Sequence, residues 1–289
     1  MSPLDHGVGI GLKLSRGAPI ESFRKVWRIA DEAGFDHCWA FDHLATTSSD
    51  GAHPVLYEGW TLLAAMAEAT TRVRVGLLVT GMTYRHPALL AKQAVTVDHL
   101  ADGRLEFGIG AGWATLEREM FGIGSPDHQV GRLSEGLQVI KLLWMHERAN
   151  FDGQYYSLTN AVANPKPIQT PHPPIWIGAS GPMMIRVAAR YADVWNWAGD
   201  GLEDAVAAGR ELTVACKQLG RDPQAIRWSA GLVFDGVDPN ATIAELRRWH
   251  AAGFNQLVVS CTGPEPVRAA EVTAEKILPA IRQLGESQR

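Results

Sequence analysis

An acid and an imidazole stand side by side at Asp42 and His43. They directly follow the short apolar run 37–41, which has the length and composition of a β-strand. Because an imidazole titrates near neutral pH, the pair could take part in proton transfer to a ring nitrogen or a substrate oxygen. A rim salt bridge or a helix cap is the alternative explanation. The position directly after a strand favours the catalytic interpretation.

The next apolar run, 73–79, ends at Val79, where the small hydroxyl residue Thr80 and then Gly81 interrupt it. Glycine lets a backbone approach a flat ligand closely, and such a segment can also hold a strained peptide bond. The alternative is an ordinary loop in which Pro87 starts a helix. Residues 79–81 are therefore a second candidate for ligand contact.

A glycine-rich run at 108–113 is superficially similar to a dinucleotide fingerprint, but position 113 is Trp where that motif requires Gly. It also lies after three strand–helix units, so a Rossmann fold is rejected. The glycines instead predict space for a ligand beside Ala111, Gly112 and Trp113. Tight packing of strand and helix would explain them almost as well.

Another glycine-rich turn precedes a helix that starts at Pro182. Free amides at a helix N-terminus, a serine hydroxyl and small residues together form a good site for a phosphate, and the alternative is a plain turn with a serine cap. The residues of this candidate site are Gly178, Ala179, Ser180 and Gly181. Downstream, 195–197 offers aromatic residues that could wall a ring, although a Trp at a barrel mouth is as often simple packing.

Short apolar runs alternate with amphipathic helices along the whole chain, which predicts a parallel sheet with helical crossovers. Eight strands are expected, at 8–12, 37–41, 73–79, 105–109, 175–177, 194–196, 228–233 and 256–260. The fold class is therefore α/β, a (β/α)8 TIM barrel, with a Pro-rich insertion at 164–174 covering one mouth, between the fourth helix (132–144) and the fifth strand. Active sites of such barrels lie at the carboxyl ends of the strands, where all the candidates fall.

Composition limits the remaining possibilities. A length of 289 residues fits one barrel domain, 1–289, since a barrel needs about 250 residues. Twenty-seven Lys and Arg nearly balance 31 Asp and Glu without a basic run, which argues against nucleic acid as a partner. No apolar stretch reaches the ~20 residues of a membrane span and no signal sequence is visible, so a cytoplasmic protein is expected. The spacing of Cys, His and Glu predicts no metal site.

Five segments, in order, resemble the luciferase-like monooxygenase superfamily, and within it the F420-dependent oxidoreductases. Any one motif is degenerate, whereas the ordered set is specific. The segments are AGFD at 33–36 with the following Asp42 and His43, VTGMTYRHPALLAK at 79–92, GRL at 103–105 with GIGAGW at 108–113, PPIWIGASG at 173–181 and AARYADVWN at 188–196.

The resemblance implies a barrel that binds a flavin or deazaflavin, with the ring in the carboxyl-terminal mouth. By this carry-over, Asp42 and His43 lie beside the ring or the substrate, and Val79, Thr80 and Gly81 form a bulge, with a non-prolyl cis peptide in many relatives, that backs the ring. Ala111, Gly112 and Trp113 line the pocket, while 178–181 holds the phosphate. A homodimer is also implied.

One departure concerns the substrate. Relatives that oxidise glucose 6-phosphate have a carboxylate where this chain has Trp113, and clear counterparts of their phosphate-binding lysines are missing. Trp113 predicts an apolar or aromatic substrate wall, and Glu117 is the nearest downstream carboxylate that could reach the site.

Three functions follow in order of preference. The first is hydride transfer between coenzyme F420 and a small organic substrate, with His43 handling the proton and Asp42 fixing the polar edge of the ring. The second is an FMN-dependent monooxygenase that uses O2 and receives electrons from a partner reductase. The third is a cofactor-binding barrel without turnover.

Overall fold

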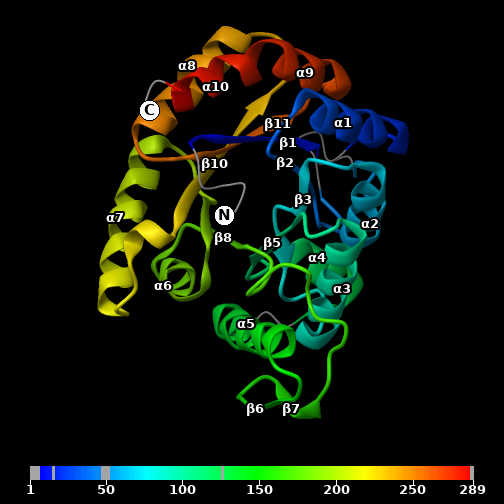
Figure 1. Cartoon of the computed structure of the whole chain (residues 1–289), viewed down its shortest axis with the longest axis vertical. Helices are drawn as coiled ribbons and strands as arrows, with labels where there is room; N and C mark the ends of the chain where they lie inside the picture. Colours follow the sequence, from blue (N-terminus) through cyan, green and yellow to red (C-terminus); the bar gives the residue numbers. More distant parts are fainter. Residues whose placement is uncertain (1–6, 15–16, 47–52, 125–126, 287–289) are drawn as a thin grey trace.

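Eight parallel strands close into a barrel in the computed structural model of the chain, which describes residues 7–14, 17–46, 53–124 and 127–286. The strand order is β3-β2-β1-β11-β10-β9-β8-β5, and pairing of β5 with β3 closes the ring. Helices surround the strands in Figure 1. The predicted (β/α)8 barrel is confirmed.

The helices and strands have the following bounds: β1 Gly9–Leu14, α1 Ile20–Ala33, β2 His37–Ala40, α2 Gly59–Ala69, β3 Arg74–Leu77, β4 Thr80–Gly81, α3 Pro87–Leu100, β5 Leu105–Gly110, α4 Thr115–Phe121, α5 Gln129–Met145, β6 Ala149–Asp152, β7 Ser157–Ala161, β8 Ile175–Ala179, α6 Pro182–Tyr191, β9 Val194–Trp197, α7 Leu202–Gln218, β10 Arg227–Phe234, α8 Pro239–Ala251, β11 Gln256–Cys261, α9 Pro266–Val272 and α10 Leu278–Glu286. Each predicted strand overlaps one barrel strand and differs from it by at most two residues at either end.

Helix α1 illustrates why the sequence folds in this way. Phe23, Val26, Trp27 and Ala30 recur at helical spacing and are all buried. Gly34 ends the helix with φ 84°, a left-handed conformation that glycine adopts without a steric penalty. The apolar face therefore packs on the sheet, and the chain turns directly into β2.

The segment between α5 and β8 contains an antiparallel hairpin, β6–β7, that the sequence analysis did not predict. The Pro-rich stretch that follows runs back along α3. There the backbone N–H of Ile168 donates to Asp98 at 2.8 Å, and Gln169 Nε2 donates to the carbonyl of Leu105 at 2.8 Å. Because Leu105 begins β5, the insertion lies at the amino-terminal rim, opposite the candidate residues.

The barrel interior is built in layers. On β1, Ile10, Leu12 and Leu14 join the core between sheet and helices, so the alternate positions Gly9, Gly11 and Lys13 face inward. The middle layer is a separate apolar cluster of Trp39, Leu78, Trp176, Val194 and Val258. We call this cluster the apolar plug.

Below the apolar plug lies a polar layer at the amino-terminal ends of the strands. Arg74 forms an ion pair with Glu106, which also accepts a hydrogen bond from Trp176 Nε1. His37 Nδ1 accepts from Trp39 Nε1 at 2.6 Å. Burial, reinforced by nearby arginines, lowers the pKa of His37 to about 3, so this imidazole is neutral.

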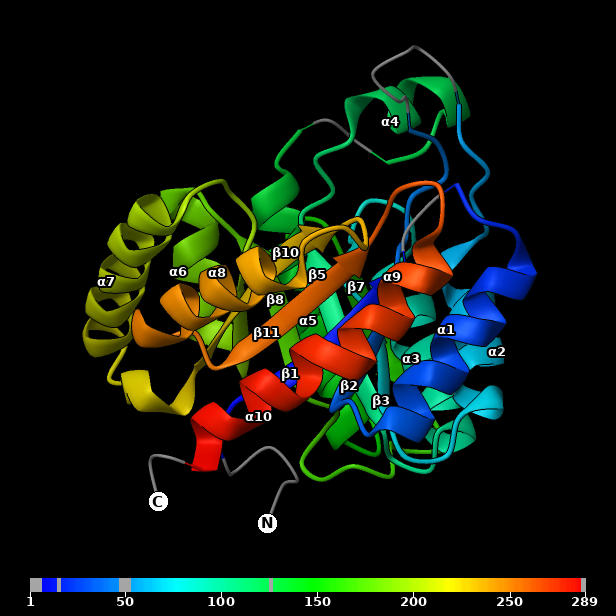
Figure 2. The ribbon, with the colours of Figure 1, turned by 90° about the horizontal axis from the view of Figure 1, so that it is seen from above.

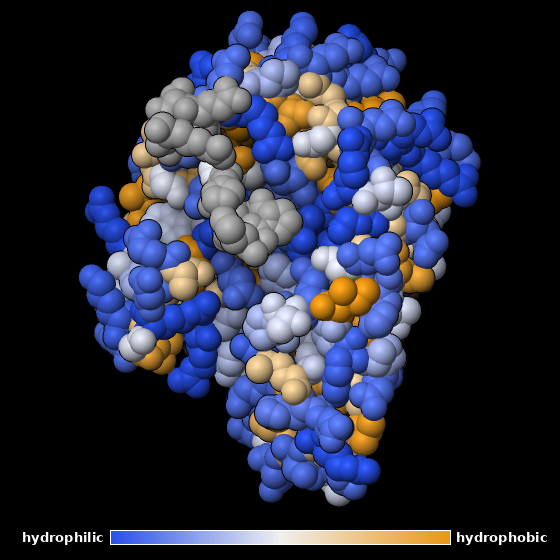
Figure 3. Space-filling view, viewed as in Figure 1, coloured by the Kyte–Doolittle hydropathy of each residue, from blue (hydrophilic) through white to orange (hydrophobic). Residues whose placement is uncertain are grey.

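Cys38, Cys216 and Cys261 are free and buried, as expected of small apolar side chains. In the described part of the chain no helix is long and apolar enough to cross a bilayer. The face seen in Figure 3 is mostly hydrophilic, with apolar side chains in separate small groups.

Candidate active site

A cavity of about 720 Å³ opens at the carboxyl ends of the barrel strands. This volume lies within the usual range for small-molecule sites. Eleven of the twelve candidate residues line it, contributed by the ends of four different strands: Asp42, His43, Val79, Thr80, Gly81, Ala111, Gly112, Trp113, Gly178, Ala179 and Ser180. The twelfth, Gly181, is exposed and does not line the cavity.

His43 is held by a carboxylate from a distant part of the chain. Its Nδ1 lies 3.0 Å from Glu117 Oε2, and Glu117, on α4, is fully buried. Figure 2 shows α4 beyond the carboxyl ends of the strands, apart from the other helices. The other oxygen of Glu117 accepts from the backbone N–H groups of Leu44 and Ala45, at 2.6 and 3.0 Å. One carboxylate thus fixes both the ring and the loop that carries it.

This contact sets the tautomer of His43. A carboxylate is an acceptor, so the proton of a neutral imidazole belongs on Nδ1. The opposite nitrogen, Nε2, takes part in no hydrogen bond among the described residues and is left for a ligand in the cavity. A neutral His43 therefore presents a basic lone pair at Nε2.

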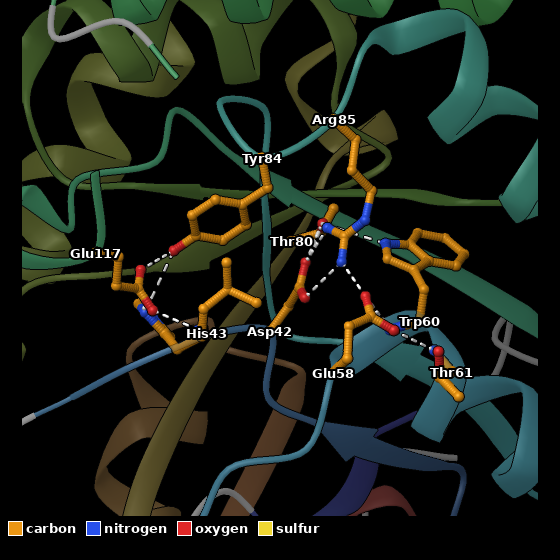
Figure 4. A network of polar contacts seen from close by, with 10 residues as sticks. Asp42, His43, Glu58, Trp60, Thr61, Thr80, Tyr84, Arg85 and Glu117 are labelled. Carbon is orange, nitrogen blue, oxygen red and sulfur yellow. Dashed lines mark hydrogen bonds and ion pairs between the residues drawn. The ribbon is translucent and has the colours of Figure 1, made fainter. Parts of the chain in front are cut away.

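Tyr84 completes this cluster. Its hydroxyl donates to the same Glu117 oxygen that contacts His43, as Figure 4 shows. Burial, then the hydrogen bond to Glu117 and the negative charge of that carboxylate, raise the pKa of Tyr84 above its ordinary value. The phenol therefore stays protonated and acts as a hydrogen-bond donor.

This electrostatic coupling gives a direct prediction. Replacing Glu117→Gln removes the carboxylate charge but keeps an oxygen that can accept, so phenolate at Tyr84 should form at lower pH than in the wild type. Burial should still keep its pKa above the ordinary value. Ultraviolet titration of phenolate absorbance measures this, with Tyr84→Phe identifying the signal among the five tyrosines. Identical Tyr84 titration curves in wild type and Glu117→Gln would contradict the coupling.

Asp42 is engaged in a second network (Figure 4). Its two oxygens accept from Arg85 at 2.7 and 3.1 Å, and one of them also accepts from the Thr80 hydroxyl. Arg85 also forms an ion pair with Glu58. Trp60 Nε1 donates to the Thr80 hydroxyl at 3.2 Å. Asp42 lines the cavity, and its predicted role toward the edge of a ring stays a prediction.

The segment around Val79 forms one wall of the cavity. The Leu78–Val79 peptide bond is cis, at the place where the family resemblance implied one. Gly110 and Gly178 line the cavity and face the Val79 side chain: an added Cβ would lie 3.0 Å from it at Gly110 and 3.4 Å at Gly178. A side chain at either position would therefore press on Val79, so glycine there lets the wall formed by Val79 keep its place.

The turn before α6 has the features of an anion site. Gly181 caps the helix without a side-chain hydrogen bond, and Pro182 is the first helical residue. The following amides of Met183 and Met184 have no partner within the helix. Ser180 and Met184 line the cavity, which brings these donors to its edge.

Aromatic rings surround His43. The ring of Phe41 lies 4.2 Å from the imidazole, and that of Trp113 lies 5.6 Å away, centroid to centroid. Trp113 is 79% exposed, so it stands at the rim of the mouth with most of its surface uncovered. The approach to His43 is thus largely aromatic.

Sequence reasoning missed Lys13, which lines the cavity from β1. It directly follows the apolar run 8–12, so the rule that found Asp42 could have found it. Sequence reasoning also gave no role to Arg85 or to Gln129. The side-chain amide of Gln129 donates to the carbonyl of Gly112 at 2.8 Å. Within the described ranges no cluster of three or more His, Cys, Asp or Glu could hold a metal ion.

The chain is similar to known proteins over most of its length. The family model described as luciferase-like monooxygenase matches residues 6–283. A similar protein is the F420-dependent hydroxymycolic acid dehydrogenase of Mycobacterium tuberculosis, 31% identical over 93% of this chain and 74% of that protein. Another is the F420-dependent glucose-6-phosphate dehydrogenase of Amycolatopsis mediterranei, 26% identical over 89% of this chain and 93% of that protein.

Among solved structures, an F420-dependent secondary alcohol dehydrogenase in complex with an F420-acetone adduct superposes with a TM-score of 0.82. The alignment covers 96% of this chain and 99% of the other, at 19% identity. At that identity the likeness concerns the fold.

Proposed function

Because the chain belongs to the luciferase-like monooxygenase family, we propose that it is an oxidoreductase that transfers a hydride between coenzyme F420 and a small organic substrate. The relatives carry this assignment: F420-dependent enzymes align with about nine tenths of the chain. The arrangement at His43 adds a proton-transfer group to the same cavity.

The residues around the cavity fit a tricyclic cofactor. Val79, Thr80 and Gly81 would back the ring, and Gly110 and Gly178 line the same cavity without side chains that would press on Val79. The indole N–H of Trp197, on the cavity wall, is buried without a partner and offers a further donor. The phosphate would lie at the turn 178–181, next to the free amides of Met183 and Met184.

A bound deazaflavin supplies the ring carbon that accepts or donates the hydride. The chain supplies the proton transfer. In the direction of alcohol oxidation, Nε2 of His43 accepts the hydroxyl proton as the hydride leaves the carbinol carbon, and Glu117 stabilises the resulting imidazolium through Nδ1–H. In the reverse direction the same nitrogen returns the proton to the carbonyl oxygen.

The substrate we propose is an uncharged, apolar alcohol or ketone. Phe41 and Trp113 supply aromatic surface next to His43. Among the described residues that line the cavity, Lys13 is the only lysine or arginine, so the cluster of cations that a phosphate ester needs is not formed there. We expect turnover of apolar secondary alcohols and little turnover of glucose 6-phosphate.

Cofactor titration tests the proposal and separates it from the FMN-dependent monooxygenase. The purified protein is titrated separately with F420 and with FMN while cofactor and tryptophan fluorescence are followed. Saturable binding of F420 with weak or no binding of FMN is the expected result. Preference for FMN would support the monooxygenase, and binding of neither would refute the cofactor assignment.

The homodimer and the cytoplasmic location stay predictions, as does the assignment of residues 1–289 to one domain. Light scattering of the purified protein tests the homodimer. Limited proteolysis tests the single domain, since one domain should resist cleavage between its strands.

A further inference from the structure

Lys13 occupies the top inward-facing position of β1. Its ammonium donates to the carbonyl of Leu78 at 2.8 Å and lies 5.4 Å from the centre of the Phe41 ring. Ser260 is its register partner on β11 and also lines the cavity. The side chain thus forms part of the cavity floor, directly above the apolar plug.

This ammonium has no counter-ion in the described part of the chain. The carboxylates around the cavity are already engaged, Asp42 with Arg85 and Glu117 with His43. Glu106, the carboxylate of the polar layer, is paired with Arg74 below the apolar plug. The charged and titratable groups that face the barrel interior near Lys13 include His37, Arg74, Glu106 and Arg227 below, and Asp42, His43, Tyr84, Arg85 and Glu117 at the mouth.

A partly buried cation without a counter-ion is unfavourable, because the loss of hydration is not repaid by an opposite charge. Burial alone lowers the pKa of Lys13 to about 8. At neutral pH the group is still mostly charged. An anion entering the cavity would remove the electrostatic cost and raise this pKa again.

A deazaflavin of the F420 type can supply that anion. Its ring hydroxyl is conjugated with the carbonyl groups of the pyrimidine ring, so it is a vinylogous acid and loses its proton far more readily than an ordinary phenol. The resulting negative charge is delocalised over the tricyclic ring.

We propose that Lys13 is the charge-binding residue for the cofactor, pairing with the anionic form of the deazaflavin ring at the floor of the cavity. This inference rests on the proposed function. It assigns to Lys13 a task distinct from that of His43, since it acts on the ionisation of the ring and His43 acts on the proton of the substrate.

The test is the ionisation of the bound cofactor, followed by its visible absorbance against pH with protein in excess. The variant Lys13→Met keeps the length of the aliphatic stem and removes the charge. The midpoint for ionisation of the bound ring should rise by about 1 to 3 pH units, the usual effect of losing a close opposite charge. Affinity for F420 at neutral pH should fall by about tenfold or more.

Two controls make the result specific. Lys13→Arg keeps a positive charge and should keep the low midpoint. Lys25→Met removes a positive charge from the exposed face of α1 and should leave both midpoint and affinity unchanged. Thermal melting of each variant checks that it is folded.

The outcomes separate this inference from the proposed function. If wild type binds F420 and Lys13→Met shows the same midpoint, the assignment of Lys13 is wrong while the function stands. If Lys13→Met weakens only the binding of an anionic substrate analogue, the assignment is equally overturned. If wild type does not bind F420, the function and this inference fail together.

Discussion

Replacing His43→Asn should lower kcat for the F420-linked reaction by about 10²–10⁴-fold, the usual contribution of a positioned general acid–base group. The amide N–H of asparagine can still donate to Glu117, as Nδ1 of His43 does at 3.0 Å. No basic nitrogen would then face the cavity. Cofactor affinity should stay close to that of wild type, because the substitution leaves the cavity wall at Val79, Thr80 and Gly81 unaltered.

Single-turnover absorbance of the cofactor measures this loss directly. The matched variant Glu117→Gln keeps the imidazole but removes the charge behind it, so its loss of kcat should be smaller than that of His43→Asn. If His43→Ala and His43→Asn bind the cofactor and turn over like wild type, the catalytic assignment is wrong and the barrel without turnover becomes the better explanation.

The largest effect on stability is expected at Arg85. Asp42 is 1% exposed, and its two oxygens accept from Arg85. Arg85→Met leaves a buried carboxylate without its cation, which costs about 3–5 kcal/mol in comparable buried pairs. Equilibrium unfolding in urea gives the change in the free energy of unfolding, provided that both proteins show the same dependence of this free energy on urea concentration.

Glu58 supplies the control, because it is the exposed partner of the same arginine, with 40% of its side chain accessible. Glu58→Gln should cost only about 0–1 kcal/mol, as exposed ion pairs do. Adding Asp42→Asn to Arg85→Met should recover part of the loss, since no buried charge then remains. Equal losses for Glu58→Gln and Arg85→Met would show that burial of Asp42 does not set the cost.

Much of the fold could be predicted because its signals are local. Apolar runs of strand length alternate with helical patterns such as the buried face Phe23 to Ala30, and such periodicity needs no knowledge of distant contacts. The placement of His43 and of 178–180 at one mouth follows from the same pattern, since the carboxyl ends of parallel strands meet at one edge.

The rest depends on contacts through space. Glu117 lies 74 residues from His43 along the chain, and only the position of α4 over the mouth brings them together. The same applies to Arg85 and Asp42, 43 residues apart. Lys13 follows an apolar run as Asp42 does, but its lack of a counter-ion is visible only when the neighbouring carboxylates are known to be engaged. The hairpin β6–β7 lacked the two-residue turn that marks most predictable hairpins.

The apolar plug has a consequence for how this barrel can change over generations. It separates the ionic layer that ties the strand beginnings together from the cavity floor. Trp113, at the rim of the cavity, lies next to His43 and is 79% exposed. Substitutions at the rim, such as at Trp113, can therefore change the substrate preference without disturbing the ion pair of Arg74 and Glu106, because the apolar plug lies between the two.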